Sequence, residues 1–335
     1  MVNVNLKRSE DTIIALDFHP KNVKMKMVKE ALRTFMNTKS DIDSSDRFNL
    51  VLFRGNPSYL EDFTFNKEYL LSLIDEDPKH INTVRVESFI FMALTFLIEV
   101  FKNVGNKFYR IIILTDEDMK PVKEEFMVKD LLNITSDMPV YLDIIRMNVK
   151  PSNDPNKDKL ETIISWSKGG KLIYVPKIKK LENTMVDLAE KKYNENDDIF
   201  EEVKELKVNP KHAGFYENIS WEPRMLQDKD LKCMACFKKG RLFECPRCHN
   251  AKMHENCWAF WSRNSNIGIR HIFRCPICYS LLMLPKQFVD DVLGEEEKIM
   301  EETIQNIEVA DQDQILMEKD KEAPKLIESL LNQFE

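Results

Sequence analysis

Cysteine is absent from the first 232 residues, and all seven cysteines fall between positions 233 and 278. Disulfides need paired cysteines and an oxidising compartment, so an odd number of cysteines in Cys-x-x-Cys spacings favours metal ligation. A signal peptide is also missing, because charged residues enter MVNVNLKRSED within its first seven positions. We therefore expect an intracellular protein, cytoplasmic, or nuclear if the organism is eukaryotic.

Long hydrophobic runs are missing as well. The most apolar stretch, SFIFMALTFLI at 88–98, lies between Glu87 and Glu99 and is shorter than the roughly 20 residues that a bilayer requires. It predicts a buried helix and no membrane partner. The net charge of -7 gives no reason to expect general binding to nucleic acid.

Motifs of common enzymes do not occur. The sequence has no Walker-type Gly-Lys-Ser, no Gly-x-Ser-x-Gly and no His-Glu-x-x-His. Three consecutive carboxylates at 116–118 lack an accompanying nucleophile, general base or phosphate-binding loop. We expect no catalytic residues and a role in binding other proteins.

Strand-like runs alternate with amphipathic helices from Asp11 to about Tyr193. This alternation predicts an α/β domain over 1–193 with a doubly wound, mostly parallel sheet. Helices are expected after the first strand, over 84–100 and over 158–168. The expected strands span 12–17, 48–53, 109–115, 140–146 and 171–175, with an edge strand near 60–65.

The first expected strand ends in Asp17, and a later strand continues into IIILTDED at 111–118. With the order of the elements, these residues resemble the von Willebrand factor A (vWA) domain; a generic doubly wound domain is the alternative. The resemblance implies an adhesion site in which Asp-x-Ser-x-Ser, a Thr and an Asp hold magnesium. Here the motif reads Asp-Phe-His-Pro-Lys at 17–21, and magnesium requires hard oxygen ligands. We therefore expect a degenerate site without magnesium, formed by Asp17, His19, Lys21, Thr83 and Asp116.

Four ligand pairs dominate the C-terminal part of the chain, and two residues separate the members of each pair. Zinc prefers four thiolate or imidazole ligands in a tetrahedron, and a Cys-x-x-Cys turn supplies two of them. The eight ligands predict two closed, structural zinc sites within residues 231–286, a module too small to fold on its core alone. Two simpler sites in tandem are the alternative. The pairs are Cys233 and Cys236, Cys245 and Cys248, His254 and Cys257, and Cys275 and Cys278.

This segment resembles the cross-braced fingers of the RING and PHD families. The resemblance implies one site of Cys233, Cys236, His254 and Cys257 and another of Cys245, Cys248, Cys275 and Cys278. Two further histidines, His249 and His271, break the paired spacing and are expected at the surface.

The choice between RING and PHD affects the predicted partner. A five-residue gap before His254 is PHD-like and would imply the reading of a histone tail, but Phe273 stands where PHD fingers carry tryptophan. The second half of the segment looks like a RING that contacts a ubiquitin-conjugating enzyme, and we favour this resemblance. Tyr279 occupies the position where many such ligases have a basic residue. The implied contact surface consists of Ala235, Trp261, Pro276 and Ile277.

Two polar segments flank the finger: a connector over 194–230 and an acidic, helical tail over 287–335. Between Asp290 and Glu322 there are 13 acids against 3 bases, a net charge of -10. Residues 231–286 carry ten Lys or Arg against two acids, and seven thiolates with two zinc ions leave a net charge of about +5. The finger thus suits an acidic partner, for which the tail is one candidate.

The sequence as a whole predicts a protein-interaction adaptor. In one reading, the vWA-like domain binds one protein while the RING-like finger recruits a ubiquitin-conjugating enzyme, as in an E3 ubiquitin ligase. In the rival reading the chain is a non-catalytic scaffold, because vWA domains followed by zinc fingers also occur in subunits of the general transcription and DNA-repair factor.

Overall fold

The computed structural model describes residues 9–53, 62–76, 83–104, 107–123, 125–167, 169–191, 208–228, 230–264 and 267–294, and the structural statements below concern these residues. The chain divides into two compact units. The first unit comprises Met1–Trp221, Asn266–Ile269 and Arg274–Leu281, and the second comprises Glu222–Ser265, Arg270–Phe273 and Leu282–Glu335.

A five-stranded parallel sheet forms the centre of the first unit, with the strand order β2-β1-β3-β4-β5. Residues of the inner strands are buried on both faces, as expected for a parallel sheet covered on both sides. The predicted α/β fold is therefore confirmed. The strands are β1 (Glu10–Asp17), β2 (Arg47–Leu52), β3 (Phe108–Thr115), β4 (Val140–Met147) and β5 (Lys171–Val175).

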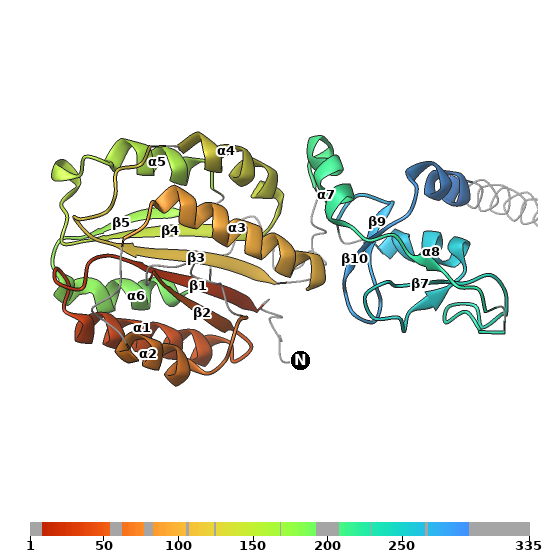
Figure 1. Cartoon of the computed structure of the whole chain (residues 1–335), viewed down its shortest axis with the longest axis horizontal. Coiled ribbons are helices and arrows are strands. Elements are labelled where there is room, and N and C mark those ends of the chain that lie inside the picture. The colour runs from red at the N-terminus through yellow and green to blue at the C-terminus, as the bar shows by residue number, and fades with distance from the viewer. Residues whose placement is uncertain are drawn as a thin grey trace, which may run out of the picture. The chain divides into compact units, whose positions relative to one another are not determined.

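Helices cover both faces of this sheet (Figure 1). The apolar stripe of the first helix, which includes Val28, Leu32 and Phe35, is fully buried in the core on its side of the sheet. One face carries α1 (Met25–Ile42), α2 (Lys67–Glu76) and α6 (Leu181–Ala189), and the other carries α3 (Val86–Asn103), α4 (Glu125–Ile134) and α5 (Lys157–Ser165). Short 3-10 turns lie at Thr135–Asp137, Pro151–Asn153, Ile178–Lys180 and Pro210–His212, and the last leads into α7 (Ala213–Ile219).

Some element boundaries differ from the prediction. The first strand begins at Glu10, two residues earlier than expected, and both Glu10 and Asp11 are buried. Charged residues are rarely buried, so the sequence did not predict that the strand includes them. Their burial is explained by the oppositely charged side chains beside them. In place of the edge strand expected near 60–65, Thr64 forms a single antiparallel bridge with Phe48, while 60 and 61 lie outside the described residues.

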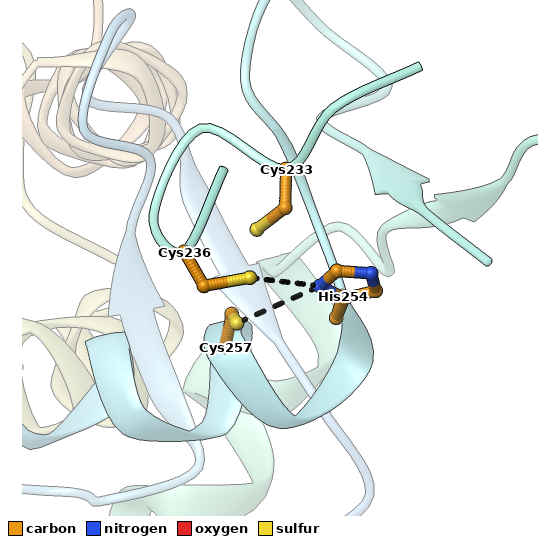
Figure 2. Close-up of side chains that lie close together, drawn as sticks. All are labelled: Cys233, Cys236, His254 and Cys257. Carbon is orange, nitrogen blue, oxygen red and sulfur yellow. Dashed lines mark hydrogen bonds between the residues drawn. The ribbon is translucent and has the colours of Figure 1, made fainter. Parts of the chain in front are cut away.

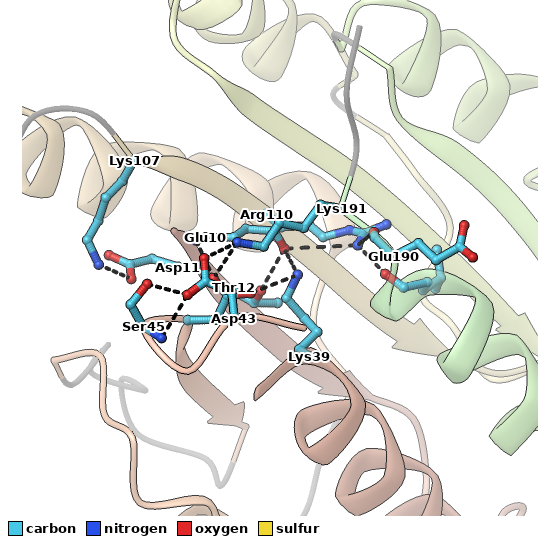
Figure 3. A network of polar contacts seen from close by, with 12 residues as sticks. Glu10, Asp11, Thr12, Lys39, Asp43, Ser45, Lys107, Arg110, Glu190 and Lys191 are labelled. Atoms are coloured by element: carbon cyan, nitrogen blue, oxygen red, sulfur yellow. Dashed lines mark hydrogen bonds and ion pairs between the residues drawn. The ribbon is translucent and has the colours of Figure 1, made fainter. Parts of the chain in front are cut away.

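Buried ion pairs surround the start of the first strand (Figure 3). The Lys39 ammonium is fully buried and lies 2.8 Å from Glu10 and 3.4 Å from Asp46. The Glu10 amide donates to the other Asp46 oxygen at 2.7 Å, and Lys191 lies 3.2 Å from that same oxygen. Each buried carboxylate of this group thus has a cation beside it.

Arg110 joins this edge of the sheet to the end of α6. Its Nε donates to Asp143 at 2.8 Å, and its Nη1 donates to the carbonyl oxygens of Leu188 and Glu190. A planar guanidinium can satisfy a carboxylate and two carbonyls at once, which a lysine cannot do in the same geometry. Arg110 therefore holds the end of α6 against the sheet.

The second unit is small and has little regular structure. Its core centres on Trp258, which is buried against Phe273 with ring centroids 5.7 Å apart and donates from Nε1 to the Phe243 carbonyl at 3.0 Å. A helix over 286–294 buries Val289 and Leu293. The other elements of the finger are the three-stranded sheet β6 (Arg224–Met225), β7 (Phe243–Glu244) and β8 (Lys252–Met253), helix α8 (Glu255–Trp261), the 3-10 turn Ser262–Asn264, and the pair β9 (Ile272–Arg274) and β10 (Leu281–Met283).

Two predictions fall partly outside the described residues. Of the expected acidic helical tail only 286–294 is described, and it is helical, while 295–335 lies outside. The connector is described from 208 onward, apart from residue 229. None of the helices in the described part of the chain is long and apolar enough to cross a membrane.

We predict that Lys39→Met lowers the free energy of unfolding by about 3 to 5 kcal/mol, because it leaves Glu10 and Asp46 buried without their shared cation. Urea denaturation followed by circular dichroism measures this loss. The control Lys179→Met changes an exposed lysine of the same unit and should shift the free energy by about 0.5 kcal/mol or less. A loss below about 1 kcal/mol for Lys39→Met would show that the two carboxylates do not depend on this lysine.

Candidate functional site

The eight predicted ligands lie together in two groups of four. Within each group the ligand atoms are all within 4.8 Å of one another. The first and third pairs share one group and the second and fourth share the other, which is the interleaved arrangement. These clusters could hold two metal ions, and their donors are consistent with zinc. The groups are Cys233, Cys236, His254 and Cys257, and Cys245, Cys248, Cys275 and Cys278.

Each of the three Cys-x-x-Cys turns closes on a residue with positive φ. Phe237, His249 and Tyr279 directly follow the second cysteine of their turns, with φ of 59°, 56° and 59°. Their amides donate to the carbonyl oxygen of the first cysteine of the same turn at 2.9, 3.0 and 3.0 Å. These tight loops hold both thiols of a pair near one metal position.

His254 faces the first cluster through Nδ1 (Figure 2). This atom lies 3.3 Å from the Cys236 sulfur and 3.8 Å from the Cys257 sulfur. His254 stands at the N-cap of α8 and Cys257 one turn further on, so the start of this helix sets both positions. Nδ1 is therefore the ligand atom that His254 offers.

The charge balance of the first cluster also fits a dication. Burial raises the pKa of the Cys233 thiol, but the backbone amides of Cys236, His254 and Ala235 outweigh burial and lower it to about 6. Burial and the neighbouring thiols Cys233 and Cys236 raise the pKa of Cys257 to about 12. A bound zinc ion would supply the positive charge that several thiolates need to coexist here. With four protein donors per cluster, no position remains for a substrate or a reactive water.

Gly240 is a residue of this site that the sequence prediction missed. A Cβ atom at this position would lie 2.6 Å from Nε2 of His254, on the side of the ring opposite to the ligand atom. The absence of a side chain thus lets the loop pack against the imidazole and hold it toward the thiols. A glycine between the first two ligand pairs was the available signal.

The two other histidines of the finger belong to neither cluster. His249 is exposed, as predicted, and its Nδ1 lies 2.9 Å from Glu244. His271 is buried, so its expected surface position is wrong. It follows the turn before β9, where the chain enters the core of the finger.

The predicted partner surface is only partly exposed. Ala235 and Ile277 are exposed, whereas Trp261 and Pro276 are partly covered. That these four side chains form one contact surface stays a prediction. Two aromatic residues outside the predicted surface are more exposed than Ile277 at 43%: Phe237 is 74% exposed and Tyr279 60%, while Phe260 is 40% exposed.

The strand order of the first unit reverses between β1 and β3, and open α/β sheets ordinarily bind ligands beside the carboxyl ends of the strands at such a point. Asp17 ends β1, and its Oδ1 accepts the amide of Val84 at 2.7 Å, next to Thr83. Its Oδ2 is buried, and none of the described residues forms a hydrogen bond with it. Burial, and after it the charge of Asp116, raises the pKa of Asp17 to about 7. Near neutral pH this carboxyl group is therefore protonated in about half of the molecules.

Asp116 has its acceptors filled by N–H donors. One oxygen accepts the His19 amide and the Asn22 side-chain amide, each at 3.1 Å, and the other accepts the Asp118 amide at 3.0 Å. Asn22 also donates to Asp118 at 2.6 Å. Asn22 lies five residues beyond Asp17, and the prediction did not include it because the family motif has no amide there.

Lys21 is exposed, and the positively charged side chains near Asp17 and Asp116 come from other residues. Arg146 donates to Thr115 Oγ1 at 3.3 Å and to the Asp116 carbonyl, and it pairs with both oxygens of Asp154 at 2.8 and 3.0 Å. The positive charges that act on Asp17 belong to Lys120 and Arg146. Amide donors and guanidinium are not magnesium ligands, so these residues do not fit a magnesium site. The expected absence of magnesium stays a prediction.

We predict that the native chain contains two zinc ions and that Gly240→Ala retains about one. The added methyl group displaces His254 from the first cluster, whereas the second cluster is untouched. Elemental analysis of purified protein measures the zinc content. Gly214→Ala is a matched control, because an added Cβ meets nothing within 4 Å there and should leave both ions in place. Equal zinc content in the two variants would show that contact with Gly240 does not position His254.

We predict that Asp17→Asn removes a specific part of the pH dependence of stability. The folded pKa of about 7 lies above the unfolded value of 3.8, so the native state binds an extra proton in this window. The stability contribution of Asp17 is thus complete below pH 4 and is lost as the pH rises through 7, by at most about 4 kcal/mol. Urea denaturation of both proteins from pH 4 to 8 measures the difference. Equal slopes, or a magnesium-dependent gain in the native chain, would contradict this account.

Comparisons with known proteins reveal a distant similarity to vWA domains. No protein-family model and no curated protein matches the chain. Similar solved structures include the VWA domain of SpRpn10 (14% identity, 54% of this chain and 95% of that one, TM-score 0.42). An aerotolerance-related membrane protein from Bacteroides fragilis has 14% identity over 54% and 98% (TM-score 0.39), and BatB from Bacteroides thetaiotaomicron has 12% over 53% and 96% (TM-score 0.38). All three TM-scores are below 0.5, so these similarities support neither a function nor the fold assignment. The α/β assignment rests on the sheet order and on the helices that cover both faces.

Proposed function

We propose that this chain is an intracellular protein-interaction adaptor with two binding modules. The vWA-like domain binds one protein, and the RING-like finger engages a ubiquitin-conjugating enzyme. The observation that carries this proposal is the pair of interleaved four-ligand clusters, because saturated metal sites serve a structural frame and not a reaction. The modules are the domain over 1–193, the connector over 194–230, the finger over 231–286 and the tail over 287–335.

Two structural zinc ions would make the finger a rigid platform. Each contributes roughly 10 kcal/mol or more to folding, which compensates for the small core around Trp258. Ile277 lies inside the last Cys-x-x-Cys turn and is 43% exposed. Exposed apolar side chains on a rigid frame are typical sites of strong binding energy in interfaces.

The ligase reading requires no catalytic residue of the chain itself. A conjugating enzyme bound to the finger and a substrate bound to the vWA-like domain would be held close together, and proximity alone accelerates transfer. Ala235, Trp261, Pro276 and Ile277 would form the docking surface.

One observation favours the rival scaffold function. Tyr279 takes the position of the basic clamp residue of many ligases, and it is 60% exposed with a left-handed backbone. A neutral aromatic ring cannot supply the charge of a clamp. In a scaffold, the same finger would contact a subunit of a larger assembly.

We predict that Ile277→Ala weakens binding to the cognate ubiquitin-conjugating enzyme about tenfold, which corresponds to about 1.4 kcal/mol. Calorimetry against a panel of conjugating enzymes identifies the cognate one and measures the loss, and metal analysis checks that both zinc ions stay bound. Val186→Ala, which truncates an exposed apolar residue of α6, is the control and should not change the affinity. If no enzyme of the panel binds, while deletion of 231–286 breaks a larger assembly, the scaffold function replaces the ligase function.

A further inference from the structure

The first Cys-x-x-Cys turn presents an exposed surface, here called the knuckle surface and defined as Lys232, residues 234–239 and the half-buried Lys252. Every residue from Met234 to Lys239 is exposed. The Met234 amide donates to the Lys252 carbonyl at 2.9 Å, so β8 lies beside the turn. Apolar and basic side chains therefore lie close together around this turn.

Phe237 is the most exposed large apolar side chain of the knuckle surface, at 74%. Its φ of 59° is the left-handed conformation, which is disfavoured for residues with a Cβ atom and which glycine adopts freely. A bulky aromatic ring in this conformation, directed to solvent, contributes nothing to the core. The turn accounts for the backbone conformation, because the Phe237 amide closes it on the Cys233 carbonyl, but the exposed ring leaves apolar surface that a partner segment can cover.

The charge of the knuckle surface is positive. Lys232, Lys238, Lys239 and Lys252 belong to it, and Asp230 pairs with Lys239 at 3.0 Å. Both members of that pair are exposed, so the pair adds little stability and can be replaced by another acid. The surface fits a segment that combines acidic and apolar residues.

Residues 295–335 of the same chain have this composition. They carry 13 Asp or Glu against 4 Lys, a net charge of -9, and end in the apolar residues of LIESLLNQF. They directly follow the helix over 286–294, which belongs to the same unit as the knuckle surface and is anchored there by Val289 and Leu293. A chain of 41 residues (295 to 335) spans up to about 130 Å when extended, far more than a small finger requires. Tethering also gives an effective concentration on the order of millimolar, which an external partner rarely reaches.

We propose that residues 295–335 bind the knuckle surface of their own chain, with acids on the lysines and apolar side chains over Phe237 and Met234. Ala235 lies within this surface and also belongs to the predicted docking surface for a conjugating enzyme. Binding of the segment and binding of a conjugating enzyme at Ala235 would therefore compete. This competition rests on the proposed function, whereas the intramolecular contact does not.

The test uses a fluorescent peptide of residues 295–335 and full-length proteins. In a tail-neutral chain six glutamates outside the described residues become glutamine: Glu295, Glu296, Glu297, Glu301, Glu302 and Glu308. We expect the peptide to bind this chain about tenfold tighter than the native chain, whose own segment competes. Raising the salt from about 50 to about 300 mM should weaken the binding, because exposed charge pairs are screened.

Substitutions in the tail-neutral chain locate the contact. Phe237→Gly should weaken peptide binding about tenfold while zinc content and stability are kept, because glycine suits the backbone there. Lys238→Ser with Lys239→Ser should weaken it similarly, and Lys179→Ser with Lys180→Ser, an exposed basic pair of the first unit, should not.

Equal binding to native and tail-neutral chains, or binding insensitive to both knuckle substitutions, overturns the inference. Conjugating-enzyme binding to the tail-neutral chain is measured in parallel. If a conjugating enzyme binds the tail-neutral chain but the peptide does not, this inference is wrong and the ligase function is unaffected. Peptide binding that depends on Phe237, without any enzyme binding, supports the inference and removes the ligase function.

Discussion

The meeting of eight ligand side chains in two interleaved groups is the constraint on which the finger over 231–286 depends. Thiols that lie this close cannot all ionise beside one another without a cation, and burial of the cysteines increases this repulsion. A dication in each group would resolve the conflict and would tie the first turn to α8 and the second turn to the last. Because each group joins segments distant in sequence, the short strands and the single helix of the finger need little core of their own.

Buried carboxylates are stabilised in different ways at the two ends of β1. At the start of β1, Glu10 and Asp46 are paired with Lys39, so charge is balanced by charge. At the end of β1, burial raises the pKa of Asp17 to about 7 although the charges of Lys120 and Arg146 lower it, so near neutral pH a proton partly neutralises this carboxylate. The ion pairs at the start of β1 stabilise the fold, whereas the carboxyl end of β1 lies at the edge where an open α/β sheet ordinarily binds ligands.

The proposed function of this chain depends on surfaces rather than on reactive groups. The three residues that close the Cys-x-x-Cys turns have left-handed backbones, and two of them, Phe237 and Tyr279, direct aromatic rings to solvent. Closure of the turns explains these backbones, and the two exposed rings leave apolar surface beside the metal clusters. The basic character of the finger adds a preference for acidic partners, and the chain supplies one such segment within reach.

The sequence by itself determined the alternation of strands and helices, the mostly parallel character of the sheet and the four ligand pairs, because apolar periodicity and Cys-x-x-Cys spacing are local signals. Tertiary structure alone decided which groups meet: Gly240 with the ring of His254, Asn22 with Asp116, and Lys39 with Glu10. It also buried His271 and extended β1 through two charged residues. These outcomes depend on strand register and on loop closure between segments up to about a hundred positions apart, and single-residue preferences contain no information about such partners.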